Sequence, residues 1–92
     1  MKPVTDAQLE EIAERFKALS DPSRLGVLRE LMAGEAAVGE IATATGQSQP
    51  NVSRHLAALK RAGFVSGTRH GQSIRYAICD PVVVKLCQLL CS

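Results

Sequence analysis

The spacing of apolar residues predicts four helices in the first two thirds of the chain. The first, over residues 5–19, begins at a Thr-x-x-Gln capping box, and the second begins at Asp21 and Pro22. Two shorter helices follow, and the tight turn between them contains Gly46. Two short helices joined by such a turn are typical of a helix-turn-helix, which we place at residues 38–62.

The pattern then changes from helical to alternating. Residues 64–69 and 72–78 predict two strands that pair as a hairpin, a β-wing spanning 64–78. Residues 80–92 predict a last helix with more apolar surface than a small domain can bury, so we expect a second copy to cover it. The expected fold is mainly α with a small β-hairpin: one dimeric winged helix-turn-helix domain over residues 1–92, in the order α-α-α-α-β-β-α.

Charge is distributed unevenly along the chain, although the formal net charge is only +2. Residues 1–46 contain eight acids and five bases, whereas residues 47–79 contain five bases and no acid. Binding a phosphate backbone requires such an acid-free basic segment, and a globular core does not. The alternative interpretation is a basic face that is merely solvated.

The fourth helix has the features of a DNA recognition helix. Its apolar residues share one face, while short or polar side chains occupy the other and leave it thin enough to enter a major groove. We expect Arg54 to donate to a guanine, Gln49 or Asn51 to read an adenine, and Ser48 to bind a phosphate. The wing tip adds backbone or minor-groove contacts. The predicted DNA-binding residues are Ser48, Gln49, Asn51, Ser53, Arg54, His55, Lys60, Arg61, Arg69, His70, Gln72 and Arg75.

The terminal helices, residues 5–19 and 80–92, are predicted to form the interface of a homodimer. The apolar side chains assigned to this interface are Leu9, Ile12, Phe16, Val83, Leu86, Cys87 and Leu90. The sequence shows no secretory signal and no apolar run of membrane-spanning length, so we expect a cytoplasmic protein without a membrane partner. It also lacks any Ser/His/Asp grouping, glycine-rich phosphate loop or carboxylate pair that indicates an enzyme.

Four segments and one tyrosine carry a family pattern. These are Ala-Leu-Ser-Asp-Pro-Ser-Arg-Leu-Gly-Val-Leu-Arg-Glu-Leu at 18–31, Val-Gly-Glu-Ile-Ala at 38–42, Ser-Gln-Pro-Asn-Val-Ser-Arg-His-Leu at 48–56, Leu-Lys-Arg-Ala-Gly-Phe-Val at 59–65, and Tyr76. Over nearly its entire length the chain resembles the ArsR (SmtB) family of bacterial repressors. The resemblance implies a homodimer built from the first and last helices and an inverted-repeat operator. It also implies release of DNA when a metal, a metalloid, or a reactive sulfur or oxidant species acts on the protein.

We therefore expect a sequence-specific, DNA-binding transcriptional repressor whose partner is a double-stranded operator. The alternative is a winged-helix protein-interaction or architectural module without sequence-specific readout. The best-known sensing sites of the family are missing from this sequence. The Cys-x-Cys pair of metal-sensing members aligns with Ala37 and Gly39, and no cysteine lies near Arg29 to form the dithiol of persulfide sensors. Asp80 matches a zinc ligand of other members, but no histidine follows it.

Three cysteines near the end of the chain leave two interpretations open. An odd number of closely spaced cysteines does not form an internal disulfide framework, so Cys79, Cys87 and Cys91 are expected to be reduced. Cys87 and Cys91 are four residues apart, and Cys79 lies just before the helix; as candidate sensors, these thiolates could bind a soft inducer such as arsenite, or the Cys87–Cys91 pair could oxidise. Alternatively, they are small apolar residues packed in a dimer core. No other metal or cofactor is expected, because His55 and His70 have no partnered ligand spacing.

Overall fold

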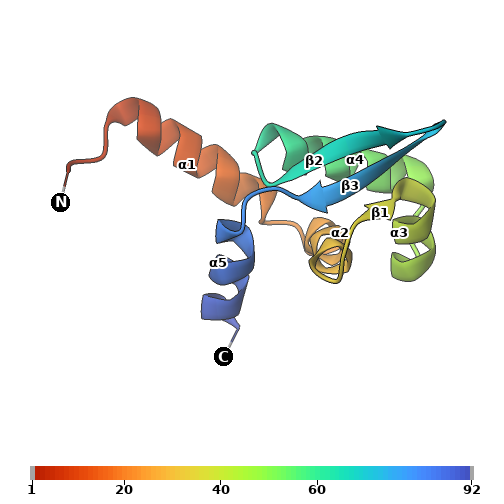
Figure 1. The fold of residues 1–92 in the computed structure, drawn as a ribbon. Helices are drawn as coiled ribbons and strands as arrows, with labels where there is room; N and C mark the ends of the chain where they lie inside the picture. Colours follow the sequence, from red (N-terminus) through yellow and green to blue (C-terminus); the bar gives the residue numbers. More distant parts are fainter. Residues whose placement is uncertain (1, 92) are drawn as a thin grey trace.

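Five helices and a small sheet make up residues 2–91, which are the residues that the computed structural model describes (Figure 1). In chain order the elements are α1 (Asp6–Ala18), α2 (Pro22–Met32), β1 (Ala36–Ala37), α3 (Val38–Thr45), α4 (Gln49–Arg61), β2 (Val65–His70), β3 (Ser73–Ile78) and α5 (Val82–Leu90).

The predicted starts of α1 and α2 are confirmed by their caps. At α1 the Gln8 backbone N–H donates to Thr5 Oγ1 (3.2 Å) and the Thr5 N–H donates to Gln8 Oε1 (2.9 Å), which completes the capping box. At α2 the carboxylate of Asp21 accepts two backbone N–H bonds of the first turn. Between α3 and α4, Gly46 has a φ of 69°, the left-handed conformation that ends α3 and lets α4 begin three residues later.

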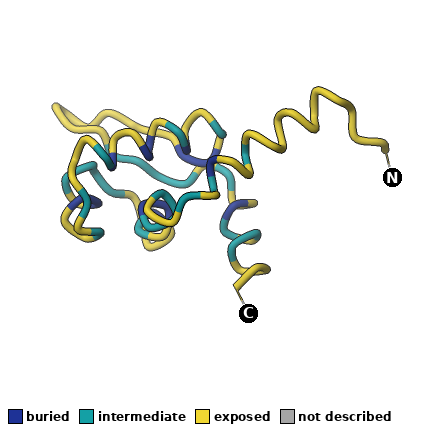
Figure 2. Tube along the Cα trace, turned by 180° about the vertical axis from the view of Figure 1, so that it is seen from behind, coloured by how far each residue is buried: buried dark blue, intermediate teal, exposed yellow. Residues whose placement is uncertain are grey.

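The core lies between α2, α3, α4 and the inner face of the sheet. Its fully buried side chains come mainly from α2 and α4, and Phe64 and Val65 join them where β2 begins. Figure 2 shows the contrast with the ends of the chain: α1 and the last turn of α5 extend from this body and are exposed along most of their length. The core therefore holds the helix-turn-helix and the wing together, and the terminal helices add little to it.

The sheet has one strand more than the sequence predicted. The hairpin of β2 and β3 is present, but β1 also pairs antiparallel with β3, in the order β1-β3-β2. In this register Ala36 is opposite Tyr76 and Ala37 is opposite Arg75. A strand of two residues is too short to show any alternation, so nothing in the local pattern could reveal it. Its effect is to attach the wing to the segment that leads into α3.

The last helix begins two residues later than predicted. Asp80 lies before α5, where its carboxylate accepts the Val82 N–H (3.0 Å) and pairs with Arg15 of α1 (2.6 Å). Both interactions lower the pKa of Asp80, the backbone hydrogen bond being the larger cause. Val83 is completely buried within the protomer, so its assignment to the dimer interface is wrong. It anchors α5 to the body instead.

Candidate nucleic-acid interface

The outer face of α4 is exposed and carries no acidic side chain. Val52, Leu56 and Leu59 are buried, as predicted. The exposed positions of the helix are Gln49, Pro50, Ser53, Arg54, Ala57, Lys60 and Arg61. The polar and basic side chains of this face flank a single small residue at its middle, Ala57, which leaves the helix narrow enough for a DNA groove.

The first turn of α4 is exposed and capped by a serine. Ser48 is its N-cap, and Ser48 Oγ accepts the Asn51 N–H at 3.2 Å. Because Pro50 has no N–H and the Asn51 N–H is capped, the N–H groups of Ser48 and Gln49 are left without an intrahelical acceptor, and together with the helix dipole they attract negative charge. Ser48, Gln49 and Pro50 are all exposed, so a phosphate can approach this end of the helix.

Two of the predicted base-reading residues contact each other. Arg54 Nη2 donates to Asn51 Oδ1 at 2.8 Å. The other half of the same amide is also occupied, because Asn51 Nδ2 donates to Gln47 Oε1 at 2.9 Å. Gln47 in turn donates from Nε2 to the carbonyl oxygen of Ser23 at 2.9 Å. Sequence reasoning did not include Gln47 or Ser23, because their bonds link the start of α2 to a turn more than twenty residues away.

His55 is not on the DNA-facing surface, so the prediction that it contacts DNA is wrong. The residue is only 7% exposed and lies on the buried side of α4. Its Nδ1 accepts a hydrogen bond from Arg24 Nε at 3.3 Å. Burial lowers the pKa of the ring, because desolvation disfavours the charged form. The spacing of positions 52, 55, 56 and 59 matches one helical face and was the signal that could have placed it there.

At the wing tip, Arg69, His70 and Gln72 are exposed on the hairpin, where Gly71 forms the turn with a φ of 64°. The three residues lie at the end of β2 and in the β2–β3 turn, and this end of the hairpin points away from the terminal helices (Figure 1). The three residues are exposed, and their contact with DNA stays a prediction.

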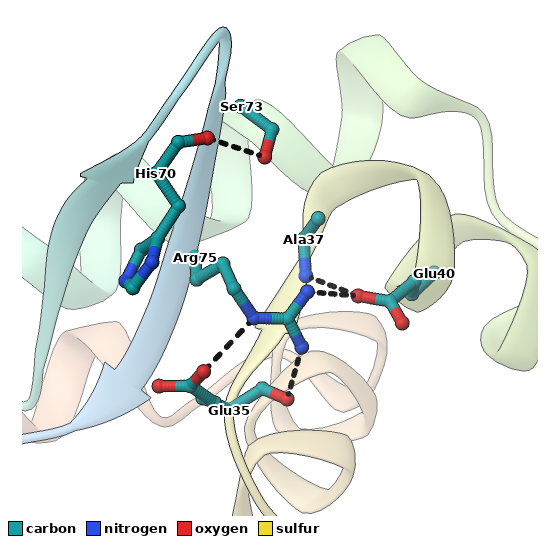
Figure 3. A network of polar contacts seen from close by, with 6 residues as sticks. All are labelled: Glu35, Ala37, Glu40, His70, Ser73 and Arg75. Atoms are coloured by element: carbon teal, nitrogen blue, oxygen red, sulfur yellow. Dashed lines mark hydrogen bonds and ion pairs between the residues drawn. The ribbon is translucent and has the colours of Figure 1, made fainter.

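Arg75 is held by carboxylates instead of facing DNA, which corrects the prediction for this residue (Figure 3). Its Nε donates to Glu35 Oε1 (3.0 Å), its Nη1 to Glu40 Oε1 (3.0 Å) and its Nη2 to the Glu35 carbonyl oxygen (3.1 Å). The hydrogen bond to Glu35 and the charge of Glu40 raise the pKa of Arg75. Glu40 also accepts the Ala37 N–H (2.9 Å). This hydrogen bond is the largest cause of the lowered pKa of Glu40, and the positive charge of Arg75 is the next. The guanidinium therefore fastens β3 to Glu35, just before β1, and to Glu40, in the first turn of α3.

The terminal helices expose a set of large apolar side chains. On α1 these are Leu9 (54%), Ile12 (42%) and Phe16 (52%), and on α5 they include Leu89 (82%) and Leu90 (75%). A hollow of about 220 Å³ between the two helices is lined mainly by apolar groups: Arg15, Phe16, Leu19, Phe64, Val82 and Leu86. The guanidinium of Arg15 stacks 4.5 Å from the centroid of the Phe64 ring and so joins α1 to the body.

The cysteines differ in their exposure. Cys87 is half-buried against the core, whereas Cys79 and Cys91 are exposed, and none of the three forms a disulfide within the described residues. Between residues 2 and 91, no group of three or more His, Cys, Asp or Glu side chains is arranged to hold a metal ion. In the same part of the chain, no helix combines the length and the apolar character needed to cross a bilayer.

The sequence is similar to regulators of known type. Residues 21–66 match the family model described as "Bacterial regulatory protein, arsR family". The chain is 43% identical over 77 residues to the probable mercury resistance operon repressor of Streptomyces lividans. The match covers 84% of this chain and 62% of that protein. It is 37% identical over 84 residues to the HTH-type transcriptional regulator NmtR of Mycobacterium tuberculosis. The match covers 91% of this chain and 70% of that protein.

A solved structure has the same fold. It is the homodimeric winged helix-turn-helix DNA-binding domain (fragment 1–100) of Mb0332 from Mycobacterium bovis, described as a possible ArsR-family transcriptional regulator. The TM-score is 0.85 at 39% identity, and the match covers 98% of this chain and 86% of that one. The winged helix-turn-helix fold predicted from the sequence is thereby confirmed. The chain spans less than two thirds of the length of the mercury resistance operon repressor. It belongs to the arsR family of bacterial regulatory proteins.

Proposed function

We propose that this protein is a transcriptional repressor that binds an inverted-repeat DNA operator as a homodimer. The observation that carries the proposal is the outer face of α4, which is exposed, basic and free of acids while its inner face is fixed in the core. A rigid helix with these properties fits the major groove of B-DNA. A repressor acting on bacterial DNA works in the cytoplasm, which agrees with the location expected from the sequence.

Each part of the surface has a distinct role in the proposed complex. The first turn of α4 and Ser48 bind a backbone phosphate, and Arg54 enters the major groove to donate to a guanine. Lys60 and Arg61 neutralise phosphates at the other end of the helix. On the wing, Arg69 with its neighbours His70 and Gln72 contacts the backbone or the adjacent minor groove. Arg75 contributes indirectly, because its ion pairs set the position of the wing.

The exposed apolar side chains of α1 and α5 support the dimer. Large apolar side chains concentrated on two neighbouring helices mark a protein interface, since monomers rarely leave such a patch in water. The related domain from Mycobacterium bovis is described as homodimeric. A two-fold axis through these helices presents two copies of α4 to the same side of a duplex, roughly 34 Å apart for consecutive major grooves.

A DNA-binding titration tests the proposal. The probe is the duplex that the wild-type protein prefers in a random pool, compared with a scrambled duplex of the same composition. Arg54→Ala is expected to weaken binding to the preferred duplex by about tenfold or more and to reduce the preference itself. Arg29→Ala, which removes an exposed base on α2 away from α4 and the terminal helices, is the matched control and should bind as the wild type does. Equal affinity of the wild type for both duplexes would instead support an architectural or protein-interaction module.

We also infer that a soft, thiol-reactive metal or metalloid releases the protein from DNA through Cys87 and Cys91. The two cysteines are one helical turn apart at the end of α5, and Cys91 is exposed to an incoming ion. Both lie on the helix that we assign to the dimer interface, so an ion bound there can alter the spacing of the two recognition helices. A relative of this chain is named for a mercury resistance operon.

The inducer is tested by repeating the titration with arsenite, mercuric ion, zinc, persulfide and peroxide. Release by arsenite or mercuric ion that is lost in Cys87→Ser with Cys91→Ser, and kept in the matched Cys79→Ser control, is the expected result. An identical response from the double variant would show that these thiols serve only as apolar packing.

A further inference from the structure

A chain of hydrogen bonds runs from the start of α2 to the exposed face of α4. It begins at the carbonyl oxygen of Ser23, which accepts from Gln47 Nε2 (2.9 Å). Gln47 Oε1 then accepts from Asn51 Nδ2 (2.9 Å), and Asn51 Oδ1 accepts from Arg54 Nη2 (2.8 Å). This series of hydrogen bonds therefore connects the body of the protein to the Arg54 guanidinium that we assign to base recognition.

The two ends of this chain fix the direction of both amides between them. A backbone carbonyl can only accept, so Gln47 must turn its Nε2 toward Ser23 and its Oε1 toward Asn51. A guanidinium can only donate, so Asn51 must turn its Oδ1 toward Arg54. Reversing either amide would bring two oxygens or two N–H groups face to face. The orientation of the Asn51 side chain is thus determined from both sides.

His55 does not compete for the Asn51 amide. Arg24 donates to His55 Nδ1, so the proton of the neutral ring lies on Nε2. That nitrogen is 3.5 Å from Asn51 Nδ2, which is too far for a strong hydrogen bond. Both nitrogens are also donors, so neither can accept from the other. Rotating the Asn51 amide so that its oxygen accepts from His55 would break the bonds of 2.8 and 2.9 Å to Arg54 and Gln47. The amide therefore keeps the orientation set by these two partners.

The occupied amide changes the role expected of Asn51. Reading an adenine requires the amide to aim a donor and an acceptor at the base edge, whereas here one N–H and one lone pair of Asn51 hold the amide toward Gln47 and Arg54. Arg54, in contrast, keeps most of its donors free. It is exposed, and within residues 2–91 its guanidinium donates a hydrogen bond only to Asn51. Its remaining N–H groups face solvent. A helical side chain also leans toward the N-terminus of its helix, which brings Arg54 over Asn51 one turn earlier.

We propose that Asn51 is a positioning residue that holds Arg54 in the orientation needed to read a guanine, with Gln47 as its anchor. This inference rests on the proposed function, since it assigns the specificity of the same site. Without the hydrogen bond, the long Arg54 side chain samples many rotamers and must be ordered when DNA binds. With it, part of that cost is met before binding, which raises the affinity for the preferred sequence.

The inference is tested by a double-mutant cycle on the preferred duplex. Asn51→Ala alone is expected to weaken binding by about two- to tenfold, the effect of releasing one long side chain. In the Arg54→Ala background the same change should have no effect, because no guanidinium remains to be oriented. Gln47→Ala should give a smaller loss that also disappears in that background. The preference for guanine at the affected position should fall in Asn51→Ala, while the unfolding midpoint stays unchanged.

Three outcomes would overturn the inference. Additive losses from Asn51→Ala and Arg54→Ala would mean that Asn51 contacts DNA itself. Unaltered guanine preference in Asn51→Ala would mean that Arg54 does not need its partner. A wild-type protein that prefers no sequence would remove the proposed function as well, whereas the first two results leave that function intact. Arg29→Ala, which truncates an exposed side chain on α2 outside the DNA-facing surface and the terminal helices, is the control and should retain wild-type affinity.

Discussion

Truncation of Phe16 to alanine tests the dimer interface that we assign to the terminal helices. Phe16 lies near the end of α1 and lines the hollow between α1 and α5. Its side chain is 52% exposed, although phenylalanine is among the residues that gain most from burial. We expect the partner protomer to cover this exposed half, so the truncation should weaken the dimer far more than it weakens the protomer.

The size of the effect follows from the exposed area. A phenylalanine buries about 150–250 Å² when fully covered, so about 100 Å² of Phe16 remains for the partner. At about 25 cal/mol per Å², this area contributes about 2.5 kcal/mol per protomer, and two symmetric copies contribute about 5 kcal/mol. Partial repacking around the alanine reduces the loss. Phe16→Ala should therefore weaken the dimer by about 2–5 kcal/mol, or about 30-fold to several thousandfold in its dissociation constant.

Sedimentation equilibrium without DNA measures this change directly. The wild type should sediment as a dimer at micromolar concentration, and Phe16→Ala should dissociate in the same range. Ile74→Ala is the matched control, because Ile74 is 37% exposed but lies on β3 of the wing, away from α1 (Figure 1). An unchanged monomer–dimer equilibrium in Phe16→Ala, or equal weakening by Ile74→Ala, would refute the assignment of the interface to α1 and α5.

Three further predictions concern the body of the protein and its complex with DNA. Arg75→Ala should speed hydrogen exchange at the β1 amides, measured by mass spectrometry, because β3 loses its ion pairs to Glu35 and Glu40 on either side of β1; unchanged exchange would contradict this role. The lowered pKa of His55 means that the neutral ring stabilises the fold above pH 6.5 and that this contribution is lost as the pH falls. Urea unfolding between pH 7.5 and 5 should show a loss of at most about 1.4 kcal/mol per pH unit from this group, and His55→Gln should lack this component. Finally, Lys60→Ala should reduce the log–log salt dependence of DNA binding by about one, and an unaltered slope would exclude a phosphate contact.

Local chemistry made the helix boundaries predictable from the sequence. The caps at Thr5, Asp21 and Ser48 act over three residues, and the left-handed conformation at Gly46 depends on that residue alone. Such features require no knowledge of the tertiary structure. The exposed basic face of α4 was predictable for a similar reason, because one helical period separates its buried positions from its exposed ones.

Tertiary contacts decided the residues that sequence reasoning misplaced. Arg75 was assigned to DNA because it is basic, but its carboxylate partners lie 35 and 40 residues earlier and reach it only through the pairing of β1 with β3. Val83 lies on a helix that is apolar on nearly every side, so periodicity could not separate the face packed within the protomer from the face left for a partner. For His55, chemical type was given more weight than helical spacing.

Hydroxyl-radical footprinting of the wild-type protein on its preferred duplex tests most directly whether two copies of α4 read one operator. We predict two protected tracts that are related by a dyad and centred about 10 base pairs apart, one turn of B-DNA. A single protected tract, or protection that does not depend on the sequence of the duplex, would contradict the account.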